Sequence, residues 1–117
     1  MTARFKDLCL DAGDHHMIAD WWCAAMGYVR RDVVEGHADR PADWPIPIQD
    51  PEGRGPLIWV NPVPEFKAGK NRMHIDVQGD VDELVALGAK VVRPEDAEIE
   101  WTIMADPEGN EFCVSAP

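Results

Sequence analysis

The feature that most constrains the fold of this 117-residue chain is an internal repeat. The tetrapeptide Asp-Pro-Glu-Gly occurs at residues 50–53 and again at 106–109, an offset of 56 residues. Met-Gly-Tyr-Val at 26–29 is echoed by Leu-Gly-Ala-Lys at 87–90, an offset of 61 residues. Both offsets are close to half of the chain, which is typical of a protein built from two copies of one structural unit. We therefore expect a single domain over 1–117, with repeat units at about 1–64 and 70–117.

The first half reads as one strand, one helix and three further strands. Residues 5–11 alternate polar and apolar side chains, which predicts a half-buried strand. Asp14 is suited to cap a helix that Gly27 ends, and apolar residues at helical spacing lie between them. Residues 28–35 are predicted to form a strand, 36–56 a loop with an extended piece at 44–48, and 56–61 another strand.

The second half repeats this order. Residues 72–77 predict a strand, and Asp80 is suited to cap a short helix that runs to Ala86. Strands are predicted at 90–93, 98–104 and 111–115, with a tight turn at 106–109. The chain is therefore predicted to be an α+β protein made of two βαβββ units.

The charge of the chain narrows the classes of partner. Acidic groups outnumber basic ones by 22 to 11, and the net charge is −11. Such a charge repels phosphate backbones and anionic lipid surfaces, so neither nucleic acid nor a membrane is expected as a partner. No apolar run approaches the roughly 20 residues that span a bilayer, and three widely spaced cysteines indicate no disulfide framework. We expect a cytoplasmic protein, with Cys9 and Cys23 in the core.

Three stretches carry a resemblance to a known family. They are Asp14 through Tyr28, Asn71 through Val77, and Trp101 through Cys113 with its Asp-Pro-Glu-Gly turn. In these stretches the chain resembles the vicinal oxygen chelate superfamily, which includes glyoxalases, bleomycin-resistance proteins and extradiol dioxygenases, and in particular its compact glyoxalase-like domains. The resemblance implies a curled mixed sheet in which the two units enclose a cup. It also implies either a homodimer or a closely packed two-unit monomer, and we expect the homodimer.

Some members of this superfamily bind a divalent metal on inward-facing strand positions. Carried over by position, the resemblance places candidate ligands at Asp7, His74 and Cys113. The remaining position falls at about 57–59, where no side chain can bind a metal, and the enzymes would have a glutamate in place of Cys113. A divalent metal is thus one option and no cofactor the other. In the second case His74 is a strand histidine bonded to an acid such as Asp7.

Strand alternation predicts a shared polar wall. Polar side chains alternate with apolar ones in the first strand of each half and in the last strand. If these faces converge, the cup holds Asp7, Cys9, His74, Asp76, Glu111 and Cys113. An acid–histidine cluster supports general acid–base chemistry, which makes His74 and Glu111 the catalytic candidates.

Aromatic residues are the second candidate group. Trp44 lies in a proline-rich loop, where it suits a lid or a dimer contact, and Trp59 lies on a strand where it could line the cup. Core packing is expected for Trp21 and Trp101. Trp21 and Trp22 are adjacent on a helix and point in different directions, so one of them is expected to be less buried. His15 and His16, in the first turn of a helix, are expected to be exposed.

Three functional hypotheses follow. The leading one is a glyoxalase-like protein that binds a small organic molecule in the cup, with catalysis left open. Its ligand-binding candidates are Asp7, Trp44, Trp59, His74, Glu111 and Cys113. The second is a metal-dependent lyase, isomerase or dioxygenase. The third is a non-catalytic protein that sequesters a drug, for which the acidity of the chain favours a cationic aromatic compound.

Overall fold

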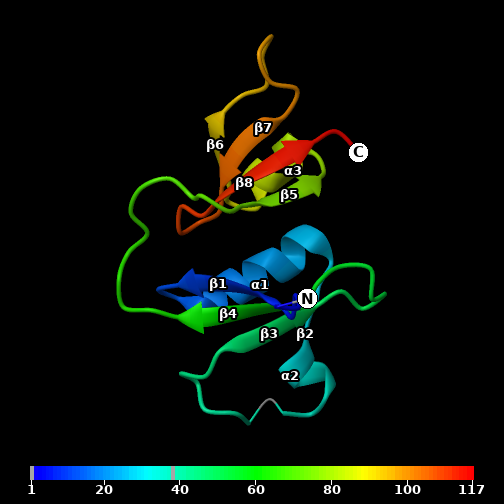
Figure 1. The fold of residues 1–117 in the computed structure, drawn as a ribbon, viewed down its shortest axis with the longest axis vertical. Coiled ribbons are helices and arrows are strands. Elements are labelled where there is room, and N and C mark those ends of the chain that lie inside the picture. The colour runs from blue at the N-terminus through cyan, green and yellow to red at the C-terminus, as the bar shows by residue number, and fades with distance from the viewer. Residues whose placement is uncertain (1, 38) are drawn as a thin grey trace. The chain divides into compact units, whose positions relative to one another are not determined.

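The computed structural model describes residues 2–37 and 39–117. The chain divides into two compact units, the first ending at Glu65 and the second covering Phe66–Pro117. Each unit has the order βαβββ, with an additional helical turn in the first unit (Figure 1). The α+β class predicted from the repeat is confirmed.

The first unit contains one four-stranded mixed sheet, in the strand order β1-β4-β3-β2. β1 pairs with β4 in parallel, and the other pairs are antiparallel. The elements are β1 (Leu8–Ala12), α1 (His15–Met26), β2 (Val29–Arg30), α2 (Arg31–Val34), β3 (Ile46–Gln49) and β4 (Ile58–Pro62).

The second unit repeats this sheet in the order β5-β8-β7-β6, and β5 again pairs in parallel with the last strand. The elements are β5 (Ile75–Gln78), α3 (Val81–Ala86), β6 (Lys90–Arg93), β7 (Thr102–Ala105) and β8 (Glu111–Ser115). The strands predicted at 90–93 and 111–115 have the predicted bounds.

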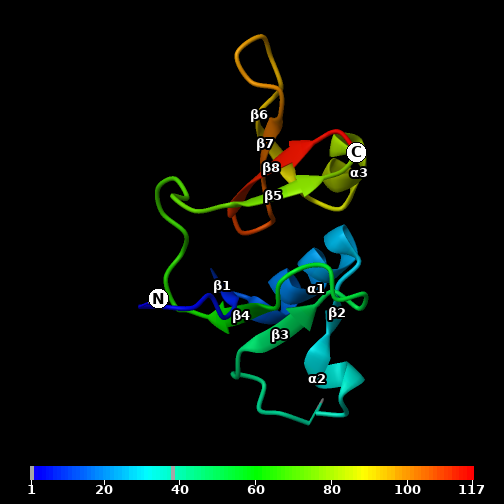
Figure 2. The same cartoon turned by 45° about the vertical axis from the view of Figure 1, so that its right-hand side comes forward.

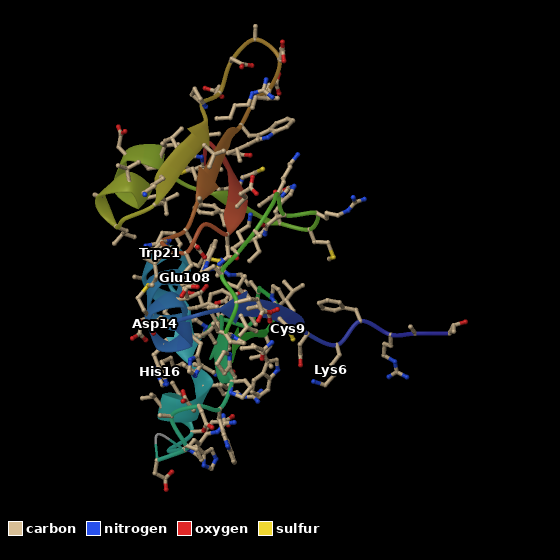
Figure 3. The ribbon with its side chains drawn as sticks, turned by 90° about the vertical axis from the view of Figure 1, so that its left-hand side faces the viewer. Lys6, Cys9, Asp14, His16, Trp21 and Glu108 are labelled. Atoms are coloured by element: carbon tan, nitrogen blue, oxygen red, sulfur yellow. The ribbon has the colours of Figure 1, made fainter. Side chains whose placement is uncertain are left out.

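Helix α1 forms between the two predicted signals. The Asp14 carboxylate accepts a hydrogen bond from the backbone N–H of Met17 at 3.1 Å, and Gly27 ends the helix with a φ of 72° (Figure 3). The helix packs against β3 and β4 (Figure 2). It buries Ile18, Ala19 and both tryptophans of the pair Trp21 and Trp22.

The prediction that one of these two tryptophans is less buried is wrong. Trp21 is 8% exposed and Trp22 2%, and their rings form an edge-to-face pair with centroids 5.0 Å apart. Edge-to-face packing lets two adjacent side chains share one apolar environment although they leave the helix in different directions.

The strand predicted at 28–35 is also wrong, because only Val29 and Arg30 are extended. The chain then turns into α2, where the Asp32 carboxylate accepts a hydrogen bond from the N–H of Val33 at 2.9 Å. Asp32 also pairs with Arg30. An aspartate that bonds the neighbouring backbone in this way favours a turn over a strand, although the valines around it favour a strand.

Each sheet has a buried face and an open face. Ile46, Ile48, Ile58 and Val60 are buried in the first sheet, and Met104, Phe112 and Val114 are buried in the second. The residues between them in each strand lie on the opposite face. This alternation places Cys9 on the open face of the first sheet, where it is exposed, so its predicted place in the core is wrong.

Candidate functional site

A row of three paired residues crosses the open face of the second sheet. Asp76 of β5 lies opposite Cys113 of β8, and Cys113 lies opposite Ile103 of β7. His74 directly precedes β5, and because it lies two residues before Asp76 it extends the same face. The sheet register therefore brings together the polar residues that the alternation pattern predicted for the second unit.

The histidine of this row is bonded to a carboxylate. His74 Nδ1 lies 2.9 Å from Asp76 Oδ1. The side chains of His74 and Asp76 are 41% and 70% exposed, so both remain accessible. The acid bonded to His74 is thus Asp76. Asp7 was the example of such an acid suggested from the sequence.

Cys113 completes the cluster. One ligand atom from each of His74, Asp76 and Cys113 lies within 4.8 Å of the other two. Burial raises the pKa of the Cys113 thiol, and the Asp76 charge and a hydrogen bond to Asp76 raise it further. A thiol of raised pKa is a poor nucleophile at neutral pH, so this geometry does not activate Cys113 for covalent catalysis.

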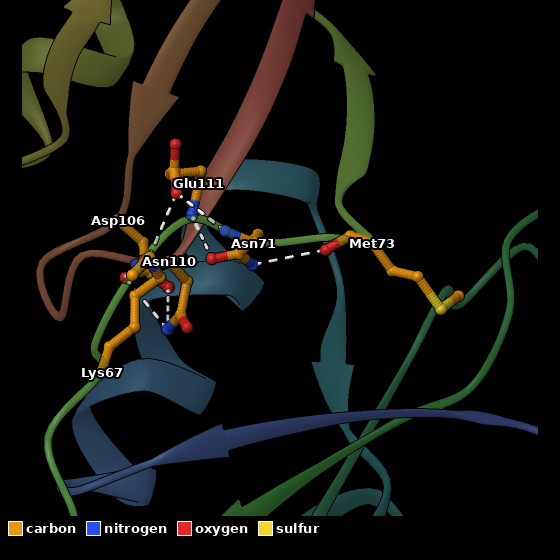
Figure 4. Close-up of polar contacts among 7 residues, drawn as sticks. Lys67, Asn71, Met73, Asp106, Asn110 and Glu111 are labelled. Carbon is orange, nitrogen blue, oxygen red and sulfur yellow. Dashed lines mark hydrogen bonds and ion pairs between the residues drawn. The ribbon is translucent and has the colours of Figure 1, made fainter.

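Glu111 lies at the start of β8 and holds the loop that precedes β5. Its Oε1 accepts hydrogen bonds from the Asn71 N–H at 2.9 Å and from Lys67 Nζ at 3.1 Å, and its own N–H lies 3.5 Å from Asn71 Oδ1 (Figure 4). The Asn71 N–H and then Lys67 lower the pKa of Glu111. The carboxylate is therefore an ionised anchor, which does not suit a proton donor at neutral pH.

These groups line a cavity of about 310 Å³ in the second unit. Its apolar side comes from Trp101 and Ile103, and its polar side from the cluster and from Glu111. Trp101 is 40% exposed, so its predicted place in the core is wrong. The lining residues are Lys70, Asn71, His74, Asp76, Trp101, Ile103, Glu111, Phe112, Cys113 and Ser115.

The matching row of the first sheet has different chemistry. Cys9 lies opposite Trp59, and Trp59 lies opposite Pro47. Asp7 lies two residues before Cys9, the position that His74 has relative to Asp76. The first unit thus presents an indole where the second presents a thiol.

Asp7 is engaged within its own unit. Its Oδ2 accepts hydrogen bonds from Lys6 Nζ at 2.5 Å and from Trp59 Nε1 at 3.1 Å. The bond from Lys6 is the main cause of its lowered pKa. The ligand set Asp7, His74 and Cys113 joins residues of the two units and stays a prediction.

Trp44 and Trp59 meet at a second cavity, of about 360 Å³, in the first unit. The loop that carries Trp44 is held by the first turn of α1, since His15 Nε2 lies 3.1 Å from the Trp44 carbonyl oxygen and His16 Nε2 lies 2.8 Å from that of Ala42. His15 is 8% exposed, and His16 is only partly exposed, so the expectation that both are exposed is wrong. The loop is remote in sequence from the helix, so no local signal could have shown these contacts.

Comparison with known proteins decides the family. A sequence profile described as a glyoxalase-like domain matches residues 7–115. The chain belongs to the glyoxalase-like domain family. Through it the chain is a member of the glyoxalase, bleomycin-resistance and dioxygenase superfamily, as its motifs predicted.

Solved structures of this glyoxalase-like superfamily share the fold at low identity. A glyoxalase/bleomycin resistance protein/dioxygenase family enzyme from Burkholderia phytofirmans PsJN has a TM-score of 0.69 at 16% identity, with 96% of this chain and 97% of that chain covered. The fosfomycin resistance protein of Listeria monocytogenes has a TM-score of 0.69 at 16% identity, with 100% and 93% covered.

The trypanothione-dependent glyoxalase I of Leishmania major has a TM-score of 0.62 at 19% identity, with 98% of this chain and 87% of that chain covered. No curated protein sequence matches the chain. None of the helices within 2–37 and 39–117 is long and apolar enough to cross a lipid bilayer.

Proposed function

We propose that this glyoxalase-like protein binds a small organic molecule with a cationic group and an aromatic body in the cavity of the second unit. The proposal rests on the cluster of His74, Asp76 and Cys113, which lines the same cavity as the exposed Trp101. A volume of about 310 Å³ suits a fragment-sized molecule.

The charges of the cavity favour a cation. The Asp76 carboxylate is 70% exposed and is held in place by His74. An indole face such as that of Trp101 attracts a cation by about 0.5–2 kcal/mol. The only lysine among the lining residues, Lys70, lowers the pKa of Glu111, so its charge is offset within the cavity. The net charge of −11 adds a long-range attraction.

Binding is tested with 1-naphthylmethylamine and its neutral counterpart 1-naphthylmethanol by titration calorimetry. We expect the amine to bind at least tenfold more tightly, because a charge-assisted hydrogen bond is worth about 1.5–3 kcal/mol. Asp76→Asn is expected to remove this preference for the amine. Trp101→Ala is expected to weaken the binding of both compounds. Asp82→Asn, an exposed acid on α3, serves as the matched control. Equal binding of the two compounds would contradict the proposal.

Turnover is a separate question, and His74 is the catalytic candidate. The bond that His74 Nδ1 makes to the Asp76 carboxylate orients the imidazole ring and supports a role as general base. If the protein is an enzyme, His74→Gln is expected to abolish turnover of a substrate while its binding persists. Loss of binding and turnover together would assign His74 to binding alone.

A metal site is the second candidate function, because members of the superfamily often use divalent metals. The structure offers one nitrogen, one carboxylate oxygen and one sulfur within 4.8 Å of one another. This donor set fits a zinc-class cation better than the His and carboxylate sets that magnesium or manganese prefer. His74, Asp76 and Cys113 would hold the metal, and a bound metal would supply a Lewis acid at the cavity.

Cobalt(II) titration tests this candidate. A thiolate ligand gives cobalt an intense near-ultraviolet charge-transfer band. We expect the band in the unmodified protein and in Cys9→Ser, and its loss in Cys113→Ser and His74→Ala. A band that persists in Cys113→Ser, or absence of the band from the unmodified protein, would exclude the site.

The homodimer implied by the family stays a proposal. Light scattering after size-exclusion chromatography tests it against a chain mass of 13.1 kDa. A mass near twice that value supports the dimer, and a mass of one chain would contradict it.

A further inference from the structure

The cavity of the first unit combines two arginines with two tryptophans. It lies where α2 and the loop after it meet the open face of β3 and β4. Its lining residues are Arg31, Asp32, Glu35, His37, Arg40, Trp44, Pro47 and Trp59. Arg31 and Arg40 are two of the 11 lysines and arginines of the chain.

Each arginine lies on the face of an indole. The guanidinium carbon of Arg31 is 5.2 Å from the ring centroid of Trp59, and that of Arg40 is 4.9 Å from the centroid of Trp44. Stacking fixes the plane of a guanidinium while its N–H groups at the edge remain free to donate. Each guanidinium thus lies against an aromatic ring before any ligand binds.

Hydrogen bonds hold both tryptophans, Trp59 through its ring and Trp44 through its backbone. Trp59 lies on β4, and its Nε1 donates to Asp7 at 3.1 Å. Trp44 is held through its backbone by His15 at 3.1 Å. The indole of Trp59 is therefore held before any ligand binds, which reduces the entropy that is lost on binding, whereas Trp44 is 49% exposed.

The acids of the cavity leave cationic groups available. The Asp32 carboxylate is 7% exposed and is bonded to Arg30, which is not among the lining residues, at 3.1 Å and 3.3 Å. Glu35 Oε2 lies 3.9 Å from Arg31 Nε, which is a loose ion pair, and its side chain is 53% exposed. Arg30 therefore neutralises Asp32 from outside the cavity. The charge of Arg40 also lowers the pKa of Asp32, but Arg40 forms none of the close ion pairs found among the described residues.

We propose that this cavity is a binding site for a small aromatic carboxylate. The guanidinium groups of Arg40 and Arg31 bind the carboxylate, and the indoles of Trp44 and Trp59 contact the ring. The class of ligand follows from the geometry, because a guanidinium edge matches the two oxygens of a carboxylate. A volume of about 360 Å³ accommodates a two-ring compound. All of its lining residues belong to the first unit.

The probe is 2-naphthoate, compared with its neutral isostere 2-naphthamide by titration calorimetry. We expect naphthoate to bind at least tenfold more tightly than the amide, since hydrogen bonds between charged groups are about twice as strong as neutral ones. Equal affinities, or no binding of naphthoate, would overturn the proposal.

Variants locate the site. Arg40→Ala is expected to weaken the binding of naphthoate at least tenfold. Arg40→Lys is expected to recover only part of this loss, because lysine lacks the planar guanidinium group that can donate two parallel hydrogen bonds to a carboxylate. Trp44→Leu is expected to weaken the binding of naphthoate and of naphthamide by the same factor. Arg54→Ala is the matched control, since Arg54 belongs to the same unit, is 79% exposed and pairs with Glu52 outside the cavity.

Amide NMR spectra of each variant establish that it is folded. An Arg40→Ala variant that is folded and binds naphthoate as tightly as the unmodified protein would overturn the proposal. An equal loss in Arg54→Ala would also overturn it, because the effect would then come from net charge alone.

Discussion

At the scale of single residues, Glu111 shows how one side chain joins two segments of the second unit. Its carboxylate accepts hydrogen bonds from the Asn71 N–H and from Lys67 Nζ, and only 18% of its side chain is exposed. These donors stabilise the ionised form and lower its pKa. A carboxyl whose pKa is lower in the folded state stabilises the protein above its unfolded pKa and loses this effect as the pH falls.

Glu111→Gln is therefore expected to lower the free energy of unfolding at pH 7 by about 1 kcal/mol, because a charge-assisted bond is lost at a partly exposed site. The difference is expected to shrink as the pH falls below the ordinary glutamate value of about 4.5. Urea unfolding of both proteins between pH 3 and pH 7 measures it. A difference that stays constant over this range would contradict the role of the charge.

The polar cluster was predictable at this scale, and the arginine–tryptophan cavity was not. Alternation along β5 and β8 is a local signal, and the parallel pairing of these strands brings Asp76 to Cys113. By contrast, Arg40 and Trp44 lie in a loop whose position depends on His15 and His16, about 25 to 30 residues earlier. A single sequence contains no local signal for such contacts.

At the scale of elements, the two Asp-Pro-Glu-Gly turns have the same construction. In each turn the aspartate accepts the backbone N–H of the residue two positions on, at 2.9 Å, and the glycine has a positive φ, 72° at Gly53 and 90° at Gly109. The repeat visible in the sequence is thus a repeat of turn chemistry. In each unit the turn lies between the last two strands.

The two copies differ in burial, which gives a matched comparison. Asp106 is 2% exposed and also binds the backbone and side chain of Asn110. Asp50 also accepts hydrogen bonds from the backbone N–H groups of Arg54 and Gly55, but it is only partly buried. Asp106→Ala is expected to lower the free energy of unfolding by about 3 kcal/mol, and Asp50→Ala by about 1 kcal/mol. The larger loss is expected at Asp106 because buried polar groups there would lose their charged partner. Urea unfolding measures both. Equal losses would show that burial does not set the cost.

The boundaries of the elements were predictable where turn chemistry marks them. Asp14, Gly27 and Asp80 bound α1 and α3 as their residue types indicate. The prediction failed at residues 31–34, where β-branched residues indicated a strand and the Asp32 carboxylate stabilises a helical turn. The side chain of one aspartate outweighed the propensity of two valines.

At the scale of the whole molecule, the repeat, the strand order and the family profile agree on one fold. The two units share this fold, yet their open faces differ in chemistry. The second unit presents His74, Asp76 and Cys113, while the first presents Trp59 between Cys9 and Pro47. Because this fold carries many activities, function must be argued from these side chains.

The measurement that tests the central claim most directly is an amide NMR titration with 1-naphthylmethylamine. We expect the amide signals of β5 and β8 and the indole N–H signal of Trp101 to shift on binding. We also expect Asp76→Asn to remove these shifts and Asp82→Asn to keep them. Shifts confined to other segments, or unchanged in Asp76→Asn, would contradict a ligand site on the open face of the second sheet.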